Sequence, residues 1–169
     1  IDGFRFDLMG VLDIETMNQA RAALVKLKPD IILYGEGWTG GDSVMPADQR
    51  ALKVNVSKMP GYGMFSDDIR DSVKGHVFYY DQLGFADGGT GKENDIRYAV
   101  TGAVKHPQVD YDRYTYTAEG AWAVRPGNSI NYVSCHDNYT LWDRYEISSP
   151  EDSVDILKRK NMLSAAIVF

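Results

Sequence analysis

Residues 3–36 carry the sequence GFRFDLMGVLDIETMNQARAALVKLKPDIILYGE, which predicts a strand, a helix and a second strand. Large apolar residues alternate with others over residues 3–6, as they do in a strand. Asp13 is a suitable N-cap for a helix whose apolar residues recur at helical spacing until Pro29 stops it. Residues 31–34 are all apolar or aromatic and predict a short strand that is buried on both faces. Such a unit implies a parallel sheet with a right-handed crossover, which places the chain in the α/β class.

The remainder of the chain predicts further helices and strands at less regular intervals. A short strand is expected over residues 63–65, followed by a helix that Ser66 or Asp67 caps and that Gly75 ends after Lys74. Three more elements are expected: a helix over about 94–105, a strand over 130–134, and an amphipathic helix over about 153–168.

Composition excludes several classes of function. The chain has 169 residues, a formal net charge of -6 and no run of Lys or Arg, so no nucleic-acid partner is predicted. No apolar stretch approaches the roughly 18 residues that cross a bilayer, so no membrane partner is predicted. Cys135 is the only cysteine, which rules out an intrachain disulfide, and it is expected to be buried as a small hydrophobe. These properties leave the localisation unknown.

Both ends of the sequence lie in apolar runs. Ile1 opens one run without a preceding Met, and Phe169 closes another. Natural termini are usually polar, so we expect residues 1–169 to be part of a longer protein, truncated at both ends.

Three carboxylates share one sequence context, because each comes directly after a predicted apolar strand. They are Asp7, Glu36 and Asp137. The carboxyl ends of barrel strands open onto one face, where active sites lie, so Asp7 and Glu36 should face each other from neighbouring strands. Two adjacent carboxyl groups are what glycoside hydrolysis requires. A single Asp after a strand is more often a cap or turn former, but three in this context favour a catalytic site.

The neighbours of the first two carboxylates suit different roles. Arg5 projects from the same strand face as Asp7, so it should lower the pKa of Asp7 and keep it ionised as a nucleophile. Glu36 lies between two glycines with Trp38 beyond. A partly desolvated, aromatic-lined position should raise the pKa of Glu36, as a general acid needs. No group of residues shows metal-ligand spacing, so no metal site is predicted.

These residues resemble the conserved regions of the alpha-amylase superfamily, glycoside hydrolase family 13. Residues 3–7 (GFRFD) resemble its second region, 34–38 (YGEGW) its third, and 133–138 (VSCHDN) its fourth. The family's first region, an Asp followed by an Asn-His pair, is not in the chain. Residues 8–10 and 67–75, with the Gly-Glu-Gly-Trp form of the third region, resemble type I pullulanases in particular.

The resemblance implies a role for each matched residue. Asp7 would be the nucleophile, Glu36 the general acid/base and Asp137 the stabiliser of the transition state. Four further residues would contact substrate: Arg5, His136, Trp38 and Asn138. The implied fold is a fragment of a TIM (β/α)8 barrel, from about strand 4 through the helix after strand 7. Such a fragment is expected to be inactive on its own.

The implied reaction is retaining hydrolysis of α-1,6 branch linkages in pullulan, amylopectin or related α-glucans, the polysaccharide partner. No organic cofactor is implied. The superfamily includes calcium-dependent members, but no calcium site is identified in this sequence. Two alternatives remain open: an isoamylase or glycogen-debranching type of enzyme, and a non-catalytic glucan-binding remnant of a barrel.

Overall fold

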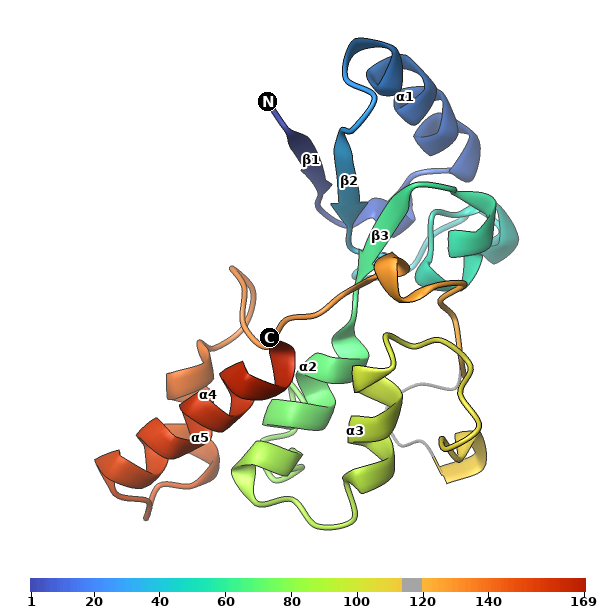
Figure 1. Ribbon diagram of the computed structural model, residues 1–169. Coiled ribbons are helices and arrows are strands. Elements are labelled where there is room, and N and C mark those ends of the chain that lie inside the picture. The colour runs from blue at the N-terminus through green and yellow to red at the C-terminus, as the bar shows by residue number, and fades with distance from the viewer. Residues whose placement is uncertain (114–119) are drawn as a thin grey trace. The chain divides into compact units, whose positions relative to one another are not determined.

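The computed structural model describes residues 1–113 and 120–169, and the chain divides into two compact units (Figure 1). The first, here called the sheet unit, consists of Ile1–Phe65 and Ala121–Ile130. The second, the helical unit, consists of Ser66–Gly120 and Asn131–Phe169. The chain therefore leaves the sheet unit after Phe65, returns to it for the short segment Ala121–Ile130, and then leaves it again.

The sheet unit is built on four parallel strands that neighbour one another in chain order. They are β1 (Gly3–Phe6), β2 (Ile32–Gly35), β3 (Tyr62–Phe65) and β4 (Ser129–Ile130). Parallel strands with intervening helices belong to the α/β class, so the class predicted from the sequence is confirmed.

Strands β1 and β2 approach each other closely at their carboxyl ends. Phe6 is paired with Gly35, and a Cβ atom at Gly35 would lie 2.5 Å from the Phe6 carbonyl oxygen. Only glycine fits this position, so Gly35 allows the last residues of the two strands to lie side by side. The prediction that β2 is buried on both faces is wrong at Ile32, which is 60% exposed because it stands at the open beginning of the strand.

Helix α1 (Ile14–Leu27) connects β1 to β2 and packs against the third strand. The predicted cap is confirmed, since Asp13 Oδ1 accepts a hydrogen bond from the Thr16 amide at 2.7 Å. Met17 is buried, and its carbonyl accepts a hydrogen bond from the Tyr62 hydroxyl at 2.9 Å. This buried contact ties α1 to β3.

The strand predicted over 130–134 is wrong in its bounds. β4 contains only Ser129 and Ile130, which pair with Met64 and Phe65. β3 ends at Phe65 and a helix follows, so the residues after Ile130 have no strand backbone to bond with.

Over the residues of the helical unit that the structure describes there are four α-helices (Figure 1): α2 (Asp67–Lys74), α3 (Glu93–Val100), α4 (Leu141–Ser148) and α5 (Val154–Val168). Its core combines side chains from these helices and from the loop before α3: Ile69, Val73, Ala86, Ala99, Tyr145 and Leu157. Ser66 and Ser153 cap α2 and α5 through their hydroxyl oxygens. Ser66 is one of the two caps predicted for α2, and the predicted start of α5 near residue 153 is confirmed. No helix in the part of the chain described here is long and apolar enough to span a bilayer.

Two helices differ from the sequence prediction. α3 ends at Val100 rather than near residue 105, because Gly102 and Ala103 adopt positive φ angles of 69° and 56° that a helix cannot contain. α4 was not predicted, although the Thr140 hydroxyl accepts a hydrogen bond from the Asp143 amide and caps it.

Candidate active site

Asp7 and Glu36 stand next to each other at the carboxyl ends of β1 and β2, each directly after its strand. A carboxylate oxygen of Asp7 lies within 4.8 Å of one of Glu36. The Asp7 side chain is 60% exposed, whereas that of Glu36 is 2% exposed. The pair therefore combines one carboxylate open to solvent with one buried beneath it.

Arg5 connects the two carboxylates. Its Nη1 atom donates to Asp7 Oδ1, and its Nη2 atom donates to Glu36 Oε1 at 2.7 Å. The guanidinium lies 5.4 Å from the centre of the Phe65 ring on β3, within the range of a cation–π attraction. Burial alone lowers the pKa of Arg5, but the bonds to Asp7 and the attraction of Glu36 raise it above its ordinary value. Arg5 thus supplies a permanent positive charge between two acidic groups.

The second oxygen of Glu36 is held by the main chain. Glu36 Oε2 accepts a hydrogen bond from the Leu8 amide at 2.6 Å. Leu8 reaches this position with a left-handed backbone, φ 40° and ψ 46°, which is unusual for a residue with a γ-branched side chain. Sequence reasoning missed this contact, because a main-chain donor leaves no signal in residue identity.

Trp38 is half-buried, and its main chain is fixed against the turn after Asp7. The Gly10 amide donates to the Trp38 carbonyl at 3.1 Å. A Cβ atom on Gly10 would lie 2.6 Å from that same carbonyl, so glycine is required here. The turn that follows β1 and the turn that follows β2 are thereby locked together.

The other predicted site residues, His136, Asp137 and Asn138, lie in the helical unit and are exposed. His136 Nε2 is 3.4 Å from the Asp137 carboxylate, and Asn138 has a positive φ of 63°. The expectation that Asp137 directly follows a strand is wrong, because β4 already ends at Ile130. Cys135 is exposed rather than buried, since it belongs to this irregular segment and not to a strand.

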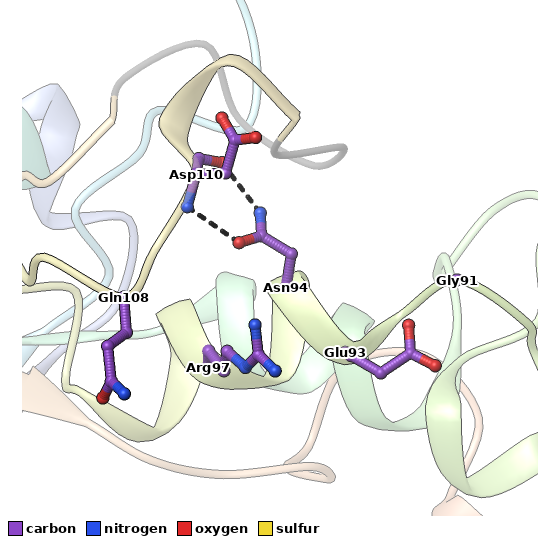
Figure 2. A pocket seen from close by; sticks show the side chains of 6 residues that line it. All are labelled: Gly91, Glu93, Asn94, Arg97, Gln108 and Asp110. Atoms are coloured by element: carbon purple, nitrogen blue, oxygen red, sulfur yellow. Dashed lines mark hydrogen bonds between the residues drawn. The ribbon is translucent and has the colours of Figure 1, made fainter.

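A polar hollow of about 400 Å³ lies in the helical unit at the start of α3 (Figure 2). It contains none of the predicted site residues; its lining consists of Gly91, Glu93, Asn94, Arg97, Gln108 and Asp110. The Asn94 side chain pairs with the main chain of Asp110, donating to its carbonyl and accepting from its amide, both at 2.8 Å. This double hydrogen bond attaches the segment after α3 to the beginning of that helix.

Comparison with known proteins finds close similarity over almost the whole chain. No protein-family model matches this chain. A pullulanase of Bacillus subtilis strain 168 is 36% identical over 168 residues, which are 99% of this chain and 22% of that protein. The chloroplastic pullulanase 1 of Arabidopsis thaliana is 31% identical over an aligned stretch of 212 positions, again 99% of this chain and 22% of that protein.

Solved structures give the same result. The apo pullulanase of Paenibacillus barengoltzii superposes with a TM-score of 0.87 at 44% identity, covering 99% of this chain and 24% of that one. The type I pullulanase of Bacillus subtilis strain 168, complexed with maltose, gives 0.86 at 35% identity over 99% of this chain and 22% of that one. The chain spans less than a quarter of these relatives, and within that span its sequence and its mixed α/β structure are similar to those of pullulanases.

Proposed function

We propose that this chain is part of the catalytic barrel of a retaining glycoside hydrolase that cleaves α-1,6 branch linkages in pullulan, amylopectin or related α-glucans. The observation that carries the proposal is the pair of carboxylates, Asp7 and Glu36, on neighbouring parallel strands. Carboxyl groups are about 5–5.5 Å apart in retaining enzymes and about 6.5–9.5 Å apart in inverting ones. Oxygen atoms within 4.8 Å of each other therefore favour retention.

The fold and the comparisons support the same assignment. Four parallel strands in chain order are what one side of a (β/α)8 barrel contains, and its active site lies at the carboxyl ends of the strands. Residues 1–169 would run from strand 4 through the helix after strand 7. Similar pullulanase structures are complexes with maltotriose, maltotetraose or maltohexaose, which makes an α-glucan the proposed substrate.

The reaction has two steps. Asp7 attacks the anomeric carbon while the glycosidic bond breaks, and Glu36 gives its proton to the departing oxygen. Glu36 then removes a proton from water, whose oxygen displaces Asp7 from the anomeric carbon. Two inversions at one carbon release the sugar with its original configuration.

The remaining predicted residues would act around these two. Arg5 would hold the Asp7 and Glu36 carboxylates in fixed positions relative to each other through its two donor nitrogens. Asp137 would stabilise the oxocarbenium-like charge, and His136 beside it would donate to a sugar hydroxyl. Trp38 and Asn138 would contact the substrate.

The test uses the full-length protein that contains this chain. Asp7→Asn should abolish release of reducing sugar from pullulan while glucan binding persists, because the amide keeps the shape but cannot form the glycosyl ester. Glu36→Gln should lower turnover about 10²- to 10⁴-fold, with the smallest loss on substrates whose leaving groups need no proton.

Matched controls are Asp30→Asn and Glu15→Gln, which make the same chemical changes at exposed positions and should leave turnover unchanged. Release from pullulan but not from linear α-1,4 amylose would support debranching. Attack on amylose alone would indicate an amylase-like enzyme. Wild-type binding without hydrolysis of either glucan would favour the non-catalytic alternative.

A further inference from the structure

The helical unit presents two exposed tyrosines in contact, Tyr80 and Tyr139, here called the tyrosine pair. Tyr80 is 37% exposed and Tyr139 is 46% exposed. Their ring centres are 5.8 Å apart and their planes meet at 63°, so the two rings pack edge to face. Within residues 1–113 and 120–169, neither phenol hydroxyl has a hydrogen-bond partner. The pair therefore offers apolar ring faces and two uncommitted hydroxyls to solvent.

Tyr80 is held in place from beneath. The guanidinium of Arg144 lies 5.3 Å from the centre of its ring, and Arg144 itself is only 1% exposed. Arg144 is paired with the buried Asp87 carboxylate at 3.7 Å and donates to the Gln82 carbonyl at 3.3 Å. One face of the Tyr80 ring is thus occupied by a fixed cation, and the ring is preorganised rather than free to turn.

The loop that carries Tyr80 is also tied down. His76 Nδ1 accepts hydrogen bonds from the amides of Phe78 and Tyr79 at 3.0 and 3.2 Å. The His76 amide donates to the Gln82 carbonyl at 3.1 Å, which closes the loop at its other end. An exposed aromatic side chain on a loop that is held at both ends loses little conformational entropy when it binds a ligand.

Tyr139 stands between the proposed substrate contacts and a capped helix. It directly follows Asn138, and it directly precedes Thr140, whose hydroxyl caps α4. The same helix carries Arg144, which supports Tyr80. One short helix therefore carries the cation that supports Tyr80 and begins directly after the segment that contains Tyr139 and Asn138.

We propose that the tyrosine pair is a stacking subsite for a glucose unit of an α-glucan chain. A pyranose ring has a face of C–H groups that packs on an aromatic face, while its hydroxyls need polar partners at the edge. Tyr supplies both, an apolar ring and a phenol hydroxyl. The ligand class rests on the proposed function; the platform itself rests on the exposure and support of the two rings.

The experiment measures maltotetraose binding by calorimetry in the full-length protein with Asp7→Asn, which prevents turnover. Tyr80→Ala and Tyr139→Ala should each weaken the affinity about 2- to 12-fold. Tyr80→Phe and Tyr139→Phe should retain most of the affinity, because the stacking face remains. Tyr79→Ala removes a neighbouring exposed tyrosine that packs on His76 and should leave the affinity unchanged. Cellotetraose, with β-1,4 linkages, should bind weakly to all variants.

The proposal would be overturned if both Ala variants bound maltotetraose as tightly as the Asp7→Asn protein does, whether or not their melting temperature fell. The outcome is separable from the proposed function. If the otherwise wild-type protein hydrolyses no glucan but the Ala variants still lose affinity, the hydrolase assignment fails and the subsite stands. If turnover on pullulan depends on Asp7 but the Ala variants bind normally, the subsite fails and the hydrolase stands.

Discussion

At the scale of single residues, Arg5 is the group on which the arrangement of the two carboxylates depends. Removing it by Arg5→Met would leave the buried Glu36 carboxylate with the Leu8 amide as its remaining donor among residues 1–113 and 120–169. We expect the free energy of unfolding to fall by about 3–5 kcal/mol, because one half of a buried ion pair is left uncompensated. Chemical denaturation measures the loss.

A double-mutant cycle separates this pairing from a general packing effect. Arg5→Met combined with Glu36→Gln should be less damaging than the sum of the two single changes, by at least about 1 kcal/mol. Strictly additive losses would mean that Arg5 stabilises the sheet unit through its stem and not through Glu36.

Lys74, at the end of α2, makes the free energy of unfolding depend on pH in the alkaline range. It is 2% exposed, and burial together with repulsion from Arg70 lowers the pKa of Lys74 to about 8. Its ammonium has a pKa of about 10.5 when the chain is unfolded, so between these values the unfolded state binds more protons. Stability should therefore rise by about 3 kcal/mol from pH 8 to pH 10.5 through this group.

The measurement is the free energy of unfolding of the wild type and of Lys74→Met from pH 7 to 10. The variant should be more stable than the wild type at pH 7, and the difference should shrink as pH rises. A difference that is constant with pH would show that Lys74 is already neutral at pH 7 or solvated when folded.

At the scale of elements, the hydrogen bonds between Asn94 and Asp110 attach a loop to a helix (Figure 2). Asn94→Ala should lower the free energy of unfolding by about 1–2 kcal/mol, because two main-chain groups lose their partner. Gln108→Ala truncates another amide of the same hollow, whose side chain makes no hydrogen bond to any residue that the structure describes, and should cost little. Equal losses in urea denaturation would contradict the role given to Asn94.

The elements that sequence reasoning predicted well are those whose ends are fixed by local chemistry. Asp13, Ser66 and Ser153 each cap the helix that follows, and Gly75 ends α2 with a φ of 92°. The length of β4 depends instead on where its partner β3 ends, which no local pattern contains. The same limit applies to the site: strand ends predicted the meeting of Asp7 and Glu36, whereas the Leu8 amide could be found only in three dimensions.

At the scale of the whole molecule, acidic residues outnumber basic ones, 24 to 18. The formal net charge is -6 and the isoelectric point is about 5.0. Repulsion between molecules vanishes near that pH, so solubility should pass through a minimum close to pH 5 and recover toward pH 7. Turbidity across this range is the measurement. A minimum displaced toward neutrality would show that surface charges pair differently from their formal count.

The return of the chain to the sheet unit has a consequence for synthesis. Met64 pairs with Ser129, so β3 must wait on the ribosome until its partner has been translated. At about 5–20 residues per second the delay is roughly 3–13 s. Throughout it, the nascent chain carries three strands with the far edge of β3 unpaired, a state open to association with other chains. Slow codons between residues 66 and 128 would lengthen that exposure without altering a single amino acid.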